Sequence, residues 1–157
     1  MKKNTLLLSM LLLVSLVFAQ QRTVLVEHFT QASCGPCASQ NPGFQSTLDS
    51  NPGKVTSIRY QVSWPGYDPM YNHNSSDVDS RVNYYGVTGV PNSVLDGNQG
   101  GPGSPATVVT NSTIDNRYNI SPDFNLVGAA DVDGQNINVN LDVTALNAVS
   151  GSIVAHI

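Results

Sequence analysis

Apolar residues between positions 23 and 95 fall into short segments with strand-like or helix-like patterns. Three runs rich in β-branched residues predict strands, and two segments with helix-start signals or helical spacing predict helices. The strands are expected over residues 23–29, 54–62 and 90–95, and the helices over residues 34–50 and 76–86. Strands that alternate with helices in this way predict an α/β domain.

Proline positions refine the expected helices. Pro36 lies in the first turn of the first helix, where a missing backbone N–H has no cost. Pro42 lies farther in, so we expect that helix to kink or to break into two pieces. Ser104 followed by Pro105 is typical of a helix start and predicts a further helix that runs to about Tyr118.

Residues 64–74 are rich in proline, glycine, asparagine and aromatic residues and are expected to form a loop. Its large side chains are Trp64, Tyr67, Met70 and Tyr71. They could line a peptide groove, or they could hold the long loop against the core. We favour the second interpretation.

The pattern changes after residue 121 to alternation of apolar and polar positions. Strands are expected over residues 124–131, 136–146 and 152–157, with Asp133-Gly134 as a hairpin turn. Three strands are too few for a sandwich, which needs about seven. We therefore expect residues 20–120 to form one domain and residues 121–157 to be the start of a truncated, β-rich, sandwich-like domain.

The first 19 residues have the features of a secretory signal peptide. Lys2 and Lys3 precede a short apolar run, and the small residue Ala19 ends it. The run is short for a bilayer span, which needs about 20 apolar residues. We expect export with cleavage after Ala19, to the periplasm, the outer membrane surface or the medium.

The charge of the chain excludes some partners. Seven basic and eleven acidic residues give a formal net charge of −4. Lys2 and Lys3 lie in the expected leader, so residues 20–157 carry five basic and eleven acidic residues, a net charge of −6. Neither a basic stripe nor a basic helix remains, which argues against nucleic acid and against anionic lipid as partners.

The two cysteines of the chain are Cys34 and Cys37, in the sequence Cys-Gly-Pro-Cys. This spacing can close a small disulfide ring where the backbone turns into a helix. Cys34 would then lie at the helix N-terminus, whose partial positive charge stabilises a thiolate. Cys37, one turn on and more buried, could attack a mixed disulfide formed at Cys34. The spacing therefore supplies a nucleophile and a resolving group.

Three other interpretations of the pair remain. In an exported chain it could be a static structural disulfide. It could be half of a zinc site, although there is no other cysteine and His28, His73 and His156 are scattered, so we expect no metal. It could also be a chance spacing in a turn. Its place between a buried strand and a helix favours the redox interpretation.

At this point the chain resembles the thioredoxin superfamily. The resemblance rests on the strand residues Val24–Phe29, the Cys34–Cys37 tetrapeptide, the helix with Pro42, and Gly89-Val90-Pro91 at the entry to a strand. It covers about residues 22–120 and implies a thioredoxin-like mixed sheet flanked by helices. It also implies that Pro91 is a cis-proline facing the dithiol and that the Val90 backbone binds the substrate's cysteine segment.

The phrase Val26–Thr30 (VEHFT) is similar to a secreted bacterial group, the twenty-eight-kilodalton outer-membrane-protein family, in which a thioredoxin-like domain precedes a β-rich domain. The resemblance implies an exported thiol–disulfide oxidoreductase that needs no cofactor. Its partners would be protein thiols or disulfides, with a membrane-linked reductant if it acts as a reductase. The alternative is an outer-membrane or surface binding protein that keeps the fold with a structural disulfide.

The same resemblance implies a buried proton acceptor for Cys37 beneath the dithiol. Counting back from Cys34 without a gap places His28 there, whereas the apolar pattern of the strand places Glu27 there. Neighbours on a strand point to opposite faces, so only one of the two can approach the dithiol. We choose Glu27, because the loop between Thr30 and Ser33 can absorb one extra residue at little cost.

Overall fold

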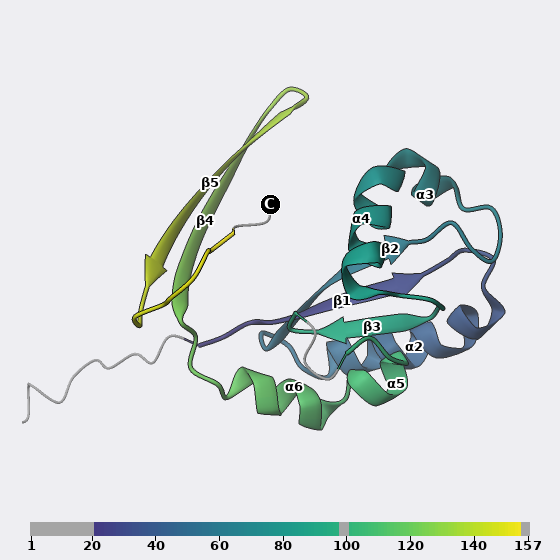
Figure 1. Cartoon of the computed structure of the whole chain (residues 1–157), viewed down its shortest axis with the longest axis horizontal. Coiled ribbons are helices and arrows are strands. Elements are labelled where there is room, and N and C mark those ends of the chain that lie inside the picture. The colour runs from purple at the N-terminus through teal and green to yellow at the C-terminus, as the bar shows by residue number, and fades with distance from the viewer. Residues whose placement is uncertain (1–20, 98–100, 155–157) are drawn as a thin grey trace, which may run out of the picture. The chain divides into compact units, whose positions relative to one another are not determined.

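The computed structural model describes residues 21–97 and 101–154 (Figure 1). The chain divides into two compact units, and each is described by itself. One unit is Arg22–Ile120, and the other comprises residues 1–21 and 121–157. The expected signal peptide, residues 1–19, lies outside the described residues. Within the part that the structure describes, no helix combines the length and apolar character needed to cross a membrane.

The Arg22–Ile120 unit is built on a mixed three-stranded sheet with the order β2-β1-β3. The central strand β1 (Val24–Thr30) pairs in parallel with β2 (Val55–Gln61) and antiparallel with β3 (Asn92–Leu95). The register aligns Phe29 with both Tyr60 and Asn92. The carboxyl ends of β1 and β2 and the first residue of β3 therefore meet at one end of the sheet.

Helices cover both faces of this sheet, so the expected α/β class is confirmed (Figure 1). Helices α3 (Pro69–His73) and α4 (Ser75–Tyr85) lie on one side. Helices α2 (Gly35–Asp49), α5 (Pro105–Val108) and α6 (Asn111–Tyr118) lie on the other. In the text below, the two faces are called the α4 face and the α2 face.

Each face of β1 contributes to a separate hydrophobic cluster, because alternate side chains of a strand point to opposite faces. Val24 and Val26 pack on the α2 face with residues such as Phe44 and Ile114. Phe29 packs on the α4 face, in a cluster completed by Val62, Val78, Val82, Tyr85, Val87 and Val94. The central strand is buried on both sides, as its apolar composition predicts.

Three helix predictions need correction. Helix α2 continues through Pro42, so the expected break into two pieces does not occur, because the packing of Cys37 and Phe44 in the core offsets one lost backbone hydrogen bond. The expected helix from Pro105 to Tyr118 is two helices, because Thr110 caps the second in a capping box with Thr113. The loop over residues 64–74 contains α3, which Asp68 caps.

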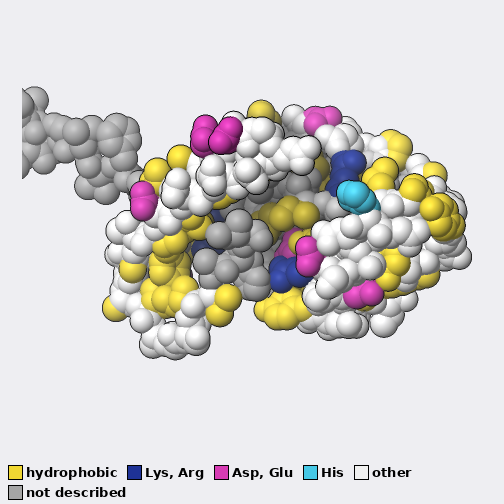
Figure 2. Space-filling model, turned by 90° about the horizontal axis from the view of Figure 1, so that it is seen from above, with side chains coloured by type: hydrophobic (Ala, Val, Ile, Leu, Met, Phe, Trp, Pro, Cys, Tyr) yellow, Lys and Arg dark blue, Asp and Glu magenta, His cyan; other side chains and the backbone are white. Residues whose placement is uncertain are grey.

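The second unit contains an antiparallel hairpin of β4 (Phe124–Asp133) and β5 (Asn136–Ala145), as expected. Its register places apolar residues opposite one another, for example Leu126 with Val143 and Val132 with Ile137, so one face is apolar. Hydrophobic side chains accordingly gather on the hairpin (Figure 2). The strand expected over residues 152–157 is absent from its described part, 152–154, and the rest lies outside the described residues.

Candidate functional site: a disulfide at the start of helix α2

The two cysteines form a disulfide at the N-terminus of α2, with an S–S distance of 2.09 Å. Cys34 is the N-cap residue, and its Sγ accepts a hydrogen bond of 3.0 Å from the backbone N–H of Cys37. A donor at this position, together with the helix dipole, stabilises negative charge on the Cys34 sulfur. The expected placement of Cys34 at the helix start is confirmed.

Both cysteines are buried in the oxidised protein. Cys37 was expected to be the more buried of the two, and it is 1% exposed, but Cys34, at 3%, is hardly more accessible. Exposure therefore does not distinguish the two sulfurs in the oxidised protein. Their hydrogen bonds distinguish them. Cys34 Sγ accepts the backbone N–H of Cys37 in the first turn of α2, and Cys37 Sγ has no such donor among the described residues.

The strand entry that contains Val90 and Pro91 lies directly beside the disulfide. The Val90–Pro91 peptide bond is cis, as expected, and the Val90 carbonyl oxygen lies 3.7 Å from Cys34 Sγ. Because β3 begins at Asn92, antiparallel to β1, the chain brings this carbonyl back to the end of the sheet where α2 starts. Trp64–Pro65 is also cis, which the sequence analysis did not predict.

The segment before Cys34 is fastened to the loop after β2. The Gln31 side chain donates to the carbonyl oxygens of Gly66 (2.9 Å) and Tyr67 (3.1 Å), and its own oxygen accepts from the Ser33 backbone N–H. Asp68 is 2% exposed, and its carboxylate accepts the Ala32 N–H at 2.9 Å. These buried contacts fix the position of the chain that leads into Cys34.

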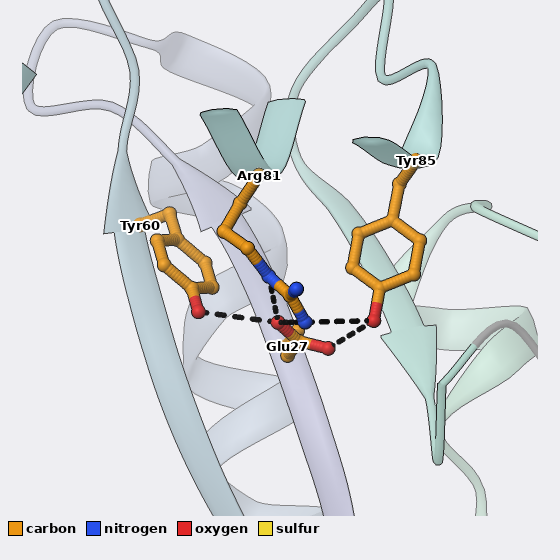
Figure 3. Close-up of polar contacts among 4 residues, drawn as sticks. All are labelled: Glu27, Tyr60, Arg81 and Tyr85. Carbon is orange, nitrogen blue, oxygen red and sulfur yellow. Dashed lines mark hydrogen bonds and ion pairs between the residues drawn. The ribbon is translucent and has the colours of Figure 1, made fainter. Parts of the chain in front are cut away.

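Glu27 lies on the α4 face, away from the helix that carries the cysteines (Figure 3). Its Oε1 accepts hydrogen bonds from Arg81 Nε (2.8 Å), Arg81 Nη2 (2.6 Å) and the Tyr60 hydroxyl (3.1 Å). Its Oε2 accepts from the Tyr85 hydroxyl. Burial, and then the bond to Glu27, raise the pKa of Tyr85, so this hydroxyl stays a donor. The prediction that Glu27 lies beneath the dithiol is therefore corrected.

His28 occupies the face where Glu27 was expected. Its Nε2 lies 3.0 Å from Asn41 Oδ1, and its ring stacks on Phe44, at 4.2 Å between centroids. Cys37, Asn41 and Phe44 are four and three residues apart along α2, so they share the helix face that packs on the sheet. The gap-free count from Cys34, the alternative we did not choose, identifies this residue.

The surroundings of His28 favour a neutral ring with its proton on Nε2. The Asn41 amide donates to Thr30 Oγ1, which directs its oxygen toward Nε2, so Nε2 carries the proton. Nδ1 is then free to accept from the Ser93 hydroxyl at 2.8 Å. Burial in the core lowers the pKa of His28 below its usual 6.5. A neutral imidazole on the dithiol's side of the sheet can accept a proton near pH 7.

The large side chains of the loop after β2 fit both earlier interpretations, since two pack against the core and two are exposed. Trp64 and Tyr71 pack against the hydrophobic cluster of the α4 face. Tyr67 and Met70 are 76% and 63% exposed. As for metals, no group of three histidine, cysteine or acidic side chains that could hold an ion occurs among residues 21–97 and 101–154.

Comparison with known proteins adds a structural likeness. No protein-family model matches the chain, and no curated protein sequence matches it. A crystal structure of a protein from Agrobacterium tumefaciens, determined by a structural-genomics consortium, is similar at a TM-score of 0.50 and 19% sequence identity. The likeness covers 78% of this chain and 58% of that protein, so the chain spans under two thirds of its neighbour. At this identity the likeness concerns the fold alone, which is mixed α/β.

Proposed function

We propose that the chain is an exported, thioredoxin-like thiol–disulfide oxidoreductase that exchanges disulfides with protein thiols through Cys34 and Cys37. The observation that carries the proposal is the Cys34 sulfur at the start of α2, 3.0 Å from a backbone N–H and 3.7 Å from the Val90 carbonyl. The N–H favours a thiolate at Cys34. The carbonyl offers an acceptor to the backbone of a substrate segment laid across Pro91, so we assign Val90 and Pro91 to substrate binding.

The proposed reaction runs in two exchanges. In the reduced protein the Cys34 thiolate attacks one sulfur of a substrate disulfide, a mixed disulfide forms, and the other substrate sulfur leaves as a thiolate. Cys37 then loses its proton and attacks Cys34 Sγ, which releases the second substrate thiol. The substrate gains two electrons and the protein regains the observed disulfide, which an external dithiol reduces again. The reverse sequence oxidises a substrate dithiol.

We propose His28, in place of Glu27, as the acceptor of the Cys37 proton. It lies on the α2 face with Asn41, one helical turn after Cys37, and its lowered pKa keeps it neutral at pH 7. Nδ1 is the ring nitrogen that can be protonated, and the resulting Nδ1–H would donate a hydrogen bond to the Ser93 oxygen. Glu27 cannot take this role from the opposite face of β1, where Arg81 holds it.

We expect His28→Gln to slow resolution of a preformed Cys34–peptide mixed disulfide by about 100-fold near neutral pH, because a general base is lost. The wild-type rate should change little between about pH 7 and pH 8, because burial holds the pKa of His28 below its usual 6.5 and the ring is mostly neutral there. The variant rate should rise about tenfold per pH unit as Cys37 ionises unaided. Glu27→Gln is the matched control. A slowed Glu27→Gln variant and an unaffected His28→Gln variant would restore the original assignment.

A redox titration tests the proposed function itself. We expect the Cys34–Cys37 pair to equilibrate with glutathione or dithiothreitol buffers at a potential above about −300 mV, read out by alkylation of the free thiols. A structural disulfide resists reduction at that potential. Resistance would favour the alternative function, a surface binding protein that keeps the fold with an inert bridge. The Cys34→Ser variant, which cannot form the bridge, gives the fully alkylatable Cys37 reference.

A further inference from the structure

The surface around the disulfide is formed by segments without charged side chains. Aspartate, glutamate, lysine and arginine are all absent from four segments of the sequence near it, which are residues 31–48, 61–67, 69–76 and 86–95. The acid between them, Asp68, is buried, and its carboxylate accepts backbone N–H groups from Ala32, Met70 and Tyr71. These four segments therefore offer a docking partner no carboxylate, ammonium or guanidinium group, and His73 is their one titratable imidazole.

Two large side chains remain uncovered on this surface. Gly66 packs so closely on Ser33 that a Cβ at Gly66 would lie 2.5 Å from Ser33 Oγ, and Gln31 binds the carbonyl of Tyr67. Tyr67 follows Gly66 directly, and the Met70 N–H binds the same Asp68 carboxylate as the Ala32 N–H. Both residues are therefore held beside the segment that leads into Cys34, yet both are mostly exposed. The loops after β1 and β2 lie at the right in Figure 1, and the right-hand edge in Figure 2 shows hydrophobic and other uncharged side chains.

We infer that Tyr67 and Met70 form a docking surface for an uncharged, apolar stretch of polypeptide next to the substrate's reacting cysteine. The inference rests on the proposed function, which it deepens by naming the class of substrate. Tyrosine contributes a rigid apolar ring with a polar tip, and methionine adapts to varied apolar shapes. Both suit a surface that must accept more than one sequence. The Val90 carbonyl, beside Cys34, would align the backbone of the same segment.

The experiment uses two neutral ten-residue peptides that each carry one cysteine as a mixed disulfide with glutathione. One has phenylalanine two residues before the cysteine and the other has serine there. We expect the double variant Tyr67→Ser/Met70→Ser to lower kcat/KM for the phenylalanine peptide about tenfold. Its rates with the serine peptide and with glutathione disulfide should stay unchanged. Tyr84→Ser is the matched control. Tyr84 is also a large side chain, 72% exposed, but its ring contacts are with Arg81 and Tyr85 of α4 and not with the segment before Cys34.

A binding measurement separates this inference from the proposed function. A fluorescent phenylalanine peptide with alanine in place of cysteine should bind the oxidised protein, and the double variant should weaken that binding about tenfold. Binding that is lost in the variant, without any exchange in the wild type, would support the surface and overturn the oxidoreductase. Exchange and binding that are both unchanged in the double variant would overturn the surface.

Two further measurements, of salt dependence and of oligomeric state, test this substrate class. The value of kcat/KM for the phenylalanine peptide should change less than about twofold between 50 and 500 mM salt, because the peptide is neutral and the four segments carry no acidic or basic side chain that could attract it. A strong salt dependence would indicate a charged partner. Sedimentation that showed a dimer in the wild type and a monomer in Tyr67→Ser/Met70→Ser would indicate that a second copy of the chain covers the surface.

Discussion

Cys37→Ser is expected to accumulate a mixed disulfide between Cys34 and its substrate, whereas Cys34→Ser is expected to form no adduct and to lose exchange activity completely. The reason is positional. Cys34 has the N–H of Cys37 at 3.0 Å and the start of α2 behind it, so its sulfur carries the negative charge more readily. Cys37 lacks such a donor and needs a base. Without Cys37, the second exchange cannot occur and the first product persists.

The measurement is non-reducing electrophoresis and mass spectrometry after the variants meet a peptide disulfide. In the reduced wild type, Cys34 should also alkylate faster than Cys37 near pH 7. The 3% exposure of Cys34 in the disulfide makes this a test of thiolate character more than of access. Equal alkylation rates, or adducts trapped equally at both cysteines, would contradict the assigned order and favour an inert bridge.

Local signals in the sequence were sufficient for the core of this unit. The apolar run of β1, the turn before α2 and the proline at its start each depend on neighbours in the chain, so the place of Cys34 as N-cap could be predicted. The cis bond before Pro91 was expected from the resemblance, not from local physics. Helix α3 had a signal that we did not use, because aspartate followed by proline, at Asp68-Pro69, is typical of a helix start.

The choice between Glu27 and His28 could not be made from pattern. A strand at the edge of a core alternates apolar and polar residues, which reveals its faces, but β1 is buried on both sides and both residues are enclosed. The polar partners that distinguish them come from distant segments: Arg81 and Tyr85 from α4, Asn41 from α2 and Ser93 from β3. Only the folded chain brings these groups together, so sequence spacing alone could not assign them.

The position of Glu27 has a consequence for stability. We expect Arg81→Met to lower the free energy of unfolding by about 3 kcal/mol, because it leaves a buried carboxylate without its counter-ion. The Glu27 side chain is 2% exposed, and Arg81 supplies two of its hydrogen bonds, at 2.8 and 2.6 Å. The Arg81 side chain is itself 23% exposed, so water can reach the carboxylate in the variant and supply part of the lost hydrogen bonding. The loss of stability should therefore lie at the lower end of the range for broken buried ion pairs.

The double variant Glu27→Gln/Arg81→Met provides the control. It removes both charges and keeps an amide that can bond Tyr60 and Tyr85, so it should be more stable than Arg81→Met alone. Urea unfolding of the oxidised protein at pH 7 measures all of these variants. A loss under about 1 kcal/mol in Arg81→Met would mean that the pair behaves like a surface ion pair. Exchange with glutathione disulfide should be unchanged in the folded variants, because this network lies on the face of β1 opposite the dithiol helix.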